Sequence, residues 1–282
     1  MTEPKDKNQD STLQTRIWLE QPQADNPFAA SACYCSGYDV YGELLSRVTW
    51  IEYLYLLFKL ELPSKEDAEL LNRVAVAIAN PGIRDHSVRA AMNAGAGGST
   101  RASALIAAIA VGAGNLNGGR DVLQMVRLWQ TLDTDINSWL AYLGADQTPD
   151  DRDSWPPMEH LAGFDPNGVS RPKPVVQTLN QLASLKPEGK LAWLESHAGI
   201  LEKALGYPLA MSGVIATAFV DLGFNEAQAE ILYLMLRLPG AAAHSLEQES
   251  NGWRKYPFFG NALKPMADSA YHQLIKSWSC KP

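Results

Sequence analysis

An Ala-rich stretch that runs into closely spaced glycines constrains this chain more than any other feature. Residues 107–122 read AAIAVGAGNLNGGRDV, and a new apolar periodicity begins at Val122. Glycines between two helices form a tight turn and leave backbone N–H groups where a ligand can approach closely. In such a turn we expect a catalytic residue at Asn117, directly before the Gly118–Gly119 pair.

Apolar residues recur at the spacing of an α-helix along most of the chain, and the alternation typical of strands is nearly absent. We therefore predict an all-α fold with more than ten helices. Helices are expected over residues 43–60, 65–79, 86–94, 99–113, 122–143, 178–185, 190–205, 210–221 and 226–247, with a short one near 267–278. Residues 99–113 are almost all Ala, Ser, Ile and Val, so we expect this helix deep in the core.

The segments between these helices are polar or rich in turn residues. Residues 1–15 are expected to be disordered, and residues 16–42 to form turns and short extended pieces. Residues 144–175 form a long loop rich in Pro, Asp and Gly, and loops of this length inside a domain are usually functional or mobile.

The composition restricts the partners and the compartment of the protein. With 282 residues, of which 46% are apolar, the chain is long enough for a large domain or a large and a small one. A net charge of -7 argues against broad nucleic-acid binding. No apolar run reaches the roughly 18 residues of a membrane span, and the polar N-terminus lacks an apolar signal region. We expect a cytoplasmic protein without a membrane partner.

The three cysteines, Cys33, Cys35 and Cys280, do not form a disulfide framework. Metal ligation by the Cys-x-Cys pair would need two further ligands nearby, and none is evident. We expect ordinary buried or half-buried thiols and no metal.

Five stretches, taken together in their order and spacing, resemble the citrate synthase superfamily, which includes citryl-CoA lyase. They span about residues 36–260 and read SGYDVYGELLSRVTWIEYLYLLFKLELPSKEDAELL, GNLNGGRDV, AGFDPNGVSRPKP, YPLAMSGVIATAFVDLGF and RLPGAAAHSLEQ. The second resembles the His-Gly-Gly turn of the family, the third its glycine loop, and the fourth its Asn-Val-Asp segment. The last is the best match, with an Arg, a Gly, then Ala-His and Glu-Gln.

The resemblance implies an all-α, citrate-synthase-like homodimer whose small domain closes over an acyl-CoA in the cleft. It implies a large domain formed by residues 16–120 and 216–282, and a small domain formed by residues 121–215. The substrate would be a coenzyme A thioester, bound together with a small carboxylate. Gly118, Gly163 and Phe164 are the residues that we expect to bind the coenzyme A part.

The catalytic triad of the family is not retained at the matching positions. Asn117 stands where the resemblance calls for a histidine that polarises the thioester carbonyl, and Ser212 stands where it calls for an aspartate base. The second histidine matches Pro166, and the loop's second glycine matches Asp165, which can supply a carboxylate to the cleft or simply form a turn. His160, three residues before Gly163, is a further histidine able to reach the cleft.

The replacement residues have limited chemistry. The amide of Asn117 can donate a hydrogen bond to a developing oxyanion but cannot transfer a proton, and Asn is also favoured in tight turns. Ser212 is a poor base unless another group activates it, and its sequence position favours a helix N-cap instead. We interpret His244 as an interior helix histidine.

The arginines that bind carboxylates in the family have counterparts here. Arg171, Arg237 and Arg254 match them, the last being the residue that a partner subunit would contribute. Because arginine binds carboxylates with a two-pronged fork, their presence indicates an anionic ligand, whereas the alternative is ordinary surface or salt-bridge residues.

Two functions remain open. The chain is either a divergent enzyme that makes or breaks a carbon–carbon bond beside a coenzyme A thioester, with Asp165 as an unusual base. Or it is a non-catalytic member that binds a carboxylate or coenzyme A, or pairs with a catalytic paralogue in a heterodimer.

Overall fold

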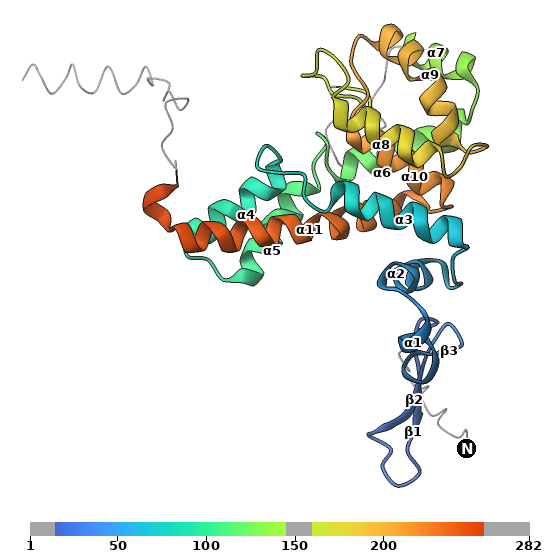
Figure 1. The fold of residues 1–282 in the computed structure, drawn as a ribbon, viewed down its shortest axis with the longest axis vertical. Helices are drawn as coiled ribbons and strands as arrows, with labels where there is room; N and C mark the ends of the chain where they lie inside the picture. Colours follow the sequence, from blue (N-terminus) through green and yellow to red (C-terminus); the bar gives the residue numbers. More distant parts are fainter. Residues whose placement is uncertain (1–14, 145–159, 257–282) are drawn as a thin grey trace, which may run out of the picture.

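The computed structural model describes residues 15–144 and 160–256 and confirms an all-α fold with more than ten helices (Figure 1). The helices are α1 (Leu45–Arg47), α2 (Trp50–Lys59), α3 (Lys65–Ile78), α4 (His86–Ala96), α5 (Arg101–Gly112), α6 (Gly119–Leu132), α7 (Ile136–Gly144), α8 (Lys173–Ala183), α9 (Lys190–Leu205), α10 (Met211–Asp221) and α11 (Glu226–Asn251). A π-helical turn, Val40–Leu44, precedes α1, and a 3-10 turn, Trp253–Lys255, follows α11. The expected features at residues 1–14 and 267–278 lie outside the described residues.

The extended pieces near the N-terminus form a small antiparallel sheet with the order β1–β2–β3. Its strands are β1 (Leu19–Pro22), β2 (Ala30–Cys35) and β3 (Tyr38–Asp39). Together with α1 and α2 the sheet occupies one end of the molecule (Figure 1). Cys33 and Cys35 lie on β2 as buried free thiols, as predicted, whereas Cys280 is outside the described residues.

The helix predicted over residues 43–60 is interrupted, because Thr49 starts a new helix. Val48 is extended, and the Thr49 hydroxyl accepts from the backbone N–H of Glu52 at 3.3 Å. The Glu52 carboxylate accepts in turn from the Thr49 backbone N–H at 2.6 Å. This capping box satisfies N–H groups that a helix end would otherwise leave unpaired, so the break is stable.

The helix predicted over residues 122–143 is also two helices. Asp133 has φ +45°, which ends α6, and Asp135 starts α7 by accepting from the backbone N–H groups of Asn137 and Ser138. Aspartate side chains favour such local hydrogen bonds over a continuous helix. The apolar periodicity hides the break because both helices face the same core.

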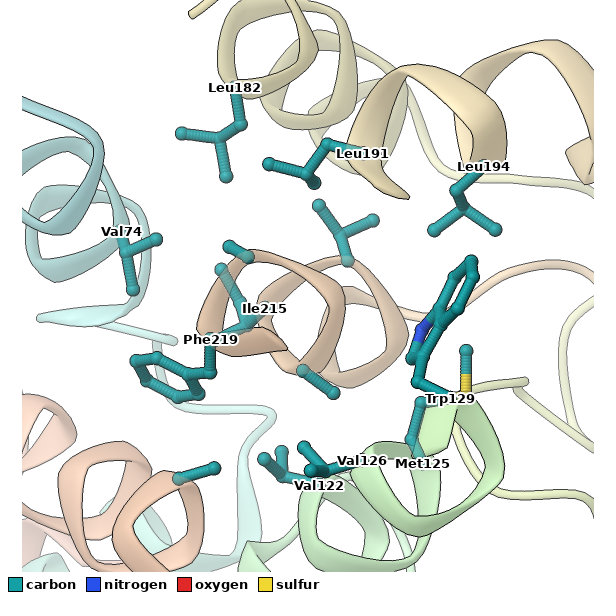
Figure 2. Close-up of a cluster of buried hydrophobic side chains, with 14 of the residues drawn as sticks. Val74, Val122, Met125, Val126, Trp129, Leu182, Leu191, Leu194, Ile215 and Phe219 are labelled. Atoms are coloured by element: carbon teal, nitrogen blue, oxygen red, sulfur yellow. The ribbon is translucent and has the colours of Figure 1, made fainter. Parts of the chain in front are cut away.

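The main hydrophobic core surrounds α10, whose residues from Ser212 to Phe219 are all buried. Figure 2 shows Ile215 and Phe219 of α10 enclosed by side chains of neighbouring helices. The labelled neighbours are Val74 of α3, Val122, Met125, Val126 and Trp129 of α6, Leu182 of α8, and Leu191 and Leu194 of α9. The indole N–H of Trp129 donates to the Thr217 hydroxyl at 2.8 Å, and that hydroxyl donates to the carbonyl of Gly213 at 2.8 Å. A helix that is apolar on all sides requires this enclosure, and the result is a rigid support for Ser212.

The prediction that the helix over residues 99–113 lies deep in the core is wrong. Only Ala104, Ala108 and Gly112 of α5 are buried, on the face that packs against α4 and α11. Ile106, with 65% of its surface exposed, and Val111, with 47%, lie on the outer face. Small residues allow close packing on one side of a helix, but they do not determine what covers the other side.

Among residues 15–144 and 160–256, no helix combines the length and the apolar character that crossing a bilayer requires.

A pair of glycine substitutions tests how tightly α10 is held against the loop that follows residue 160. A Cβ added at Gly213 would lie 2.4 Å from the carbonyl oxygen of Gly163, whereas one added at Gly199 in α9 would have nothing within 4 Å. We expect Gly213→Ala to lower the free energy of unfolding by about 2 kcal/mol through overpacking. Gly199→Ala should raise it by up to about 1 kcal/mol, because alanine favours the helix. Urea denaturation measures both, and equal effects of the two substitutions would contradict the close backbone packing.

Candidate functional site

The glycine turn between α5 and α6 has the tight geometry that its sequence predicts. Asn117 adopts a left-handed backbone with φ +52°, and Gly118 precedes the first turn of α6. A Cβ on Gly118 would lie 2.2 Å from the carbonyl oxygen of Gly114, so only glycine fits there. Asparagine tolerates the left-handed region better than most residues, which supports the role of Asn117 as a turn former.

Asn117 and Ser212 come together although 95 residues separate them. The Ser212 hydroxyl donates to Asn117 Oδ1 at 3.3 Å. Ser212 is the second residue of α10 rather than its N-cap, which is Ala210, so the N-cap alternative is wrong. Its hydroxyl is therefore directed into the turn and is fully buried there.

Asp121, which sequence reasoning missed, is the fully buried carboxylate at the centre of these residues. Its Oδ1 accepts from the backbone N–H of Gly163 at 2.8 Å. Burial raises the pKa of Asp121 to about 7, although hydrogen bonds with Ser212, Gly163 and Asn117 act in the opposite direction. The nearby charge of Asp165 raises the pKa further. The carboxyl therefore changes its protonation state near neutral pH, as groups that transfer protons in active sites do.

His160 lies beside this carboxylate. Its Nε2 is 3.9 Å from Asp121 Oδ1, and only 6% of its side-chain surface is exposed. Three residues later, Gly163 has φ +82°, and its backbone packs directly on Gly213. The loop thus brings the His160 ring next to the buried carboxylate of Asp121.

Phe164 and Asp165 hold this loop in place. The ring of Phe164 is buried in the main core, and residue 164 forms an antiparallel bridge with Leu209. The backbone N–H of Asp165 donates to the Pro208 carbonyl at 2.9 Å, and its Oδ1 accepts from the Asn167 N–H at 2.9 Å. Asp165 therefore has the geometry of a turn former, while its charge still acts on Asp121.

Arg237 reaches the turn from α11 and is almost completely buried. Its guanidinium pairs with Asp85, donates to the carbonyl of Asn117 at 3.3 Å and stacks over the ring of Tyr233 at 4.6 Å. The Tyr233 hydroxyl donates to the same carbonyl at 3.0 Å. The backbone of Asn117 is thus fixed by two side chains of α11.

The other two predicted arginines have partners of their own. Arg171 forms a two-pronged ion pair with Glu202, with both N–O distances 2.8 Å. Burial raises the pKa of Glu202, but Arg171 and the Leu209 N–H lower it more, so its pKa is below the usual value. Arg254 is exposed and lies over Trp253 at 5.3 Å.

His244 lies on α11 and is partly buried, with its Nε2 3.1 Å from Asn80 Oδ1, which agrees with an interior helix histidine. In the part of the chain that the structure describes, no group of three or more His, Cys, Asp and Glu side chains is arranged to hold a metal ion.

Comparison with solved structures shows the citrate-synthase-like fold that the sequence predicts. Citryl-CoA lyase from Hydrogenobacter thermophilus matches with a TM-score of 0.70 and 18% identity, over 91% of this chain and 95% of that chain. ATP citrate lyase from Methanothrix soehngenii, in complex with citrate and coenzyme A, matches with a TM-score of 0.70 and 16% identity, over 96% of this chain and 43% of that chain. Citrate synthase from Thermoplasma acidophilum, in a ternary complex with carboxymethyl coenzyme A and oxaloacetate, matches with a TM-score of 0.54 and 17% identity, over 79% of this chain and 60% of that chain. No protein-family model and no curated protein sequence matches the chain.

Asp121 makes the stability of the fold depend on pH in an unusual direction. An unfolded aspartate ionises near pH 3.9, whereas the folded carboxyl holds its proton up to about pH 7. Its contribution to stability is therefore fully present below about pH 4 and is lost as the pH rises through 7. Asp121→Asn keeps an acceptor for Gly163 and cannot ionise. We expect it to be more stable than wild type at pH 8, by on the order of 4 kcal/mol at most, and nearly equal at pH 4.

Asp135→Asn is the matched control for this measurement. Hydrogen bonds from the Ser138 hydroxyl and the Asn137 N–H hold the pKa of Asp135 below its usual value. Its stabilising effect is present at neutral pH and lost on acidification, so Asp135→Asn should be less stable than wild type at pH 8. Urea denaturation from pH 4 to pH 8 gives both curves. A difference between Asp121→Asn and wild type that is independent of pH would contradict the raised pKa.

Proposed function

We propose that this chain is a divergent citrate-synthase-like enzyme that makes or breaks a carbon–carbon bond between a coenzyme A thioester and a carboxylated substrate of the oxo-acid type. The observation that carries the proposal is the convergence of Asn117 and Ser212 on a buried carboxylate, Asp121, that titrates near neutral pH. A turn that only connects two helices has no need of such a group, since burying it lowers stability at neutral pH.

Asn117 is proposed to stabilise the oxygen of the thioester or of its enolate. Its Oδ1 accepts from Ser212, so the amide NH2 is the part that can donate to a substrate oxygen. Hydrogen bonds from Tyr233 and Arg237 fix its backbone. Donors that are fixed before the reaction stabilise a developing negative charge most effectively.

The carboxylated substrate is proposed to bind through Arg237, with Arg171 and Arg254 as further candidates. Arg237 supports this role best because its guanidinium already lies beside the carbonyl of Asn117. The ion pair with Asp85 uses only some of the five N–H donors of the Arg237 guanidinium. Coenzyme A is proposed to contact the backbone of Gly118 and Gly163, whereas the ring of Phe164 is committed to the core.

The alternative function is a non-catalytic protein that binds a carboxylate or coenzyme A. The observation that favours it is the internal pairing of the arginines, since Arg237 binds Asp85 and Arg171 binds Glu202 in the same chain. Such pairs stabilise the fold without any ligand. The buried Asp121 favours the enzyme, because a pKa near 7 is typical of groups that transfer protons in active sites.

We also propose that the chain forms a homodimer, or a heterodimer with a paralogue, through α5 and α11. These helices pack on each other and expose the large apolar side chains Ile106, Ile109, Val111, Ile231, Met235 and Leu246. Several exposed apolar side chains on neighbouring helices are typical of an association surface. The division into a large domain (16–120 and 216–282) and a small domain (121–215) remains part of the same proposal.

The activity is tested by incubating the protein in deuterated buffer with acetyl-CoA or another acyl-CoA, and by following cleavage of citryl-CoA. We expect exchange at the carbon next to the thioester, or cleavage, above a heat-denatured control. Arg237→Gln should lower kcat/KM for citryl-CoA by about 100-fold, because a charged hydrogen bond to a carboxylate is worth about 1.5–3 kcal/mol and its loss leaves Asp85 unpaired. Thermal stabilisation by citrate or coenzyme A without exchange or cleavage would favour the non-catalytic alternative.

Light scattering after size-exclusion chromatography tests the dimer. The wild-type chain should have about twice the monomer mass of 30.9 kDa. The double variant Ile106→Glu and Val111→Glu should be monomeric, because charges on an apolar interface oppose association. Val76→Glu on α3 replaces an equally exposed apolar residue away from α5 and should leave the mass unchanged. A monomeric wild type, or a dimer that tolerates both charges, would contradict this interface.

A further inference from the structure

We infer that His160 and Asp121 form the proton-carrying pair of this site, with His160 exchanging the proton with the substrate and Asp121 as the positioning residue behind it. The inference rests on the proposed function and names the group that replaces the missing base. It assigns this role to a residue pair instead of Asp165, the base considered from the sequence.

The geometry of the loop supports the pair. The Oδ1 atom of Asp121 accepts from the Gly163 N–H at 2.8 Å and lies 3.9 Å from His160 Nε2. One carboxylate oxygen therefore anchors the loop and faces the imidazole that the same loop carries. Because Asp121 is in the first turn of α6, the partial positive charge of the helix N-terminus also acts on it.

The burial of both side chains makes their interaction strong. Asp121 is fully buried, and His160 is 6% exposed. Water screens neither charge effectively at such a place, so an imidazolium beside a carboxylate is favoured over either charge alone. Because the pKa of Asp121 is raised to about 7, its carboxylate form is present at neutral pH and can face an imidazolium at His160.

Other titratable groups lie near the pair without replacing it. Asp165 and Tyr233 act on Asp121 directly, and Arg237 and Asp85 lie beyond Tyr233. Burial raises the pKa of Tyr233 to about 12, so it stays neutral and donates to the Asn117 carbonyl. Arg237 and Asp85 neutralise each other. Asp165 Oδ1 accepts a hydrogen bond from the backbone N–H of Asn167, and the negative charge of Asp165 disfavours ionisation of Asp121.

The proton transfer is balanced without any further reactant. The neutral imidazole of His160 takes a proton from the carbon next to the thioester, so a C–H bond breaks and an N–H bond forms. The electron pair of the C–H bond moves to the thioester oxygen as an enolate, which the amide of Asn117 stabilises. The imidazolium is held by the Asp121 carboxylate. Return of the proton regenerates the thioester, and exchange with solvent at this stage labels the carbon.

Nuclear magnetic resonance titration tests the pair without any substrate. The chain has five histidines, so with ¹⁵N-labelled histidine the signal of His160 is identified by its loss in His160→Gln. We expect Asp121→Asn to lower the titration midpoint of His160 by at least one unit, because the imidazolium loses its carboxylate partner. His197, which stacks on Trp193, is the internal control and should not change. A midpoint of His160 that is unchanged in Asp121→Asn would overturn the pair.

The deuterium exchange assay then tests the catalytic role. His160→Gln and Asp121→Asn should each slow exchange into the acyl-CoA by at least 100-fold, whereas His197→Gln should stay within twofold of wild type. Imidazole added to His160→Ala should restore part of the rate, which a purely structural defect would not allow. The loss in Asp121→Asn should also flatten the pH dependence of the rate near pH 7.

The outcomes separate the two proposals. Exchange that survives in His160→Gln, or that falls further in Asp165→Asn than in Asp121→Asn, overturns the pair and leaves the enzyme proposal standing. A wild-type protein that neither exchanges nor cleaves any acyl-CoA contradicts the proposed function and the catalytic role of the pair together. In that case the titration still decides whether His160 and Asp121 interact.

Discussion

The hydrogen bond from the Gly163 N–H to Asp121 Oδ1 joins the segments on which the site depends. Asp121 belongs to the first turn of α6, and Gly163 belongs to a loop 42 residues later. Gly163 in turn packs its backbone on Gly213 of α10, where neither residue has room for a side chain. A single buried carboxylate therefore connects the glycine turn, the loop with His160 and the start of α10. Asp121→Asn removes the charge of this side chain but keeps an oxygen that can accept from the Gly163 N–H, so the effects of charge and of hydrogen bonding can be separated.

The rigidity of this junction comes from the hydrophobic core around α10. Every residue from Ser212 to Phe219 is buried, so Ser212 has little freedom to move away from Asn117. On the opposite side, Tyr233 and Arg237 of α11 hold the carbonyl of Asn117. The polar groups thus lie where α10 and the buried face of α11 meet the turn, and water has little access to them. Low access to water is what raises the pKa of Asp121, so the packing and the electrostatics of the site have the same origin.

The sequence predicts the helical fold, and the family resemblance implies that Asn117 and Ser212 belong to one site. The sequence does not predict that Arg237 is buried. It placed the start of α6 at Val122, whereas the helix begins at Gly119, and this shift explains why Asp121 was missed. A residue in a connecting turn is expected to be exposed to solvent. Asp121 is instead the third residue of α6, and its side chain is fully buried there. The breaks at Thr49 and Asp133 were missed for a similar reason, because side-chain capping overrides a continuous apolar pattern. The burial of α5 was overestimated, because small residues indicate close packing on one face of a helix and do not show whether its other faces are covered.

The neutral side chain at position 117 and the buried carboxylate at position 121 are linked, because Asn117 is hydrogen-bonded to Asp121 through its backbone and its side chain carries no charge. A protonated histidine at 117 would place a positive charge next to the Asp121 carboxylate and favour its ionised form. With a neutral amide at 117, burial dominates, and the carboxyl keeps its proton to about pH 7. With an uncharged side chain at position 117, burial is therefore the main influence on the protonation of Asp121. If this coupling holds, Asn117→His would lower the pKa of Asp121, and the proton would move from the carboxyl to the new imidazole.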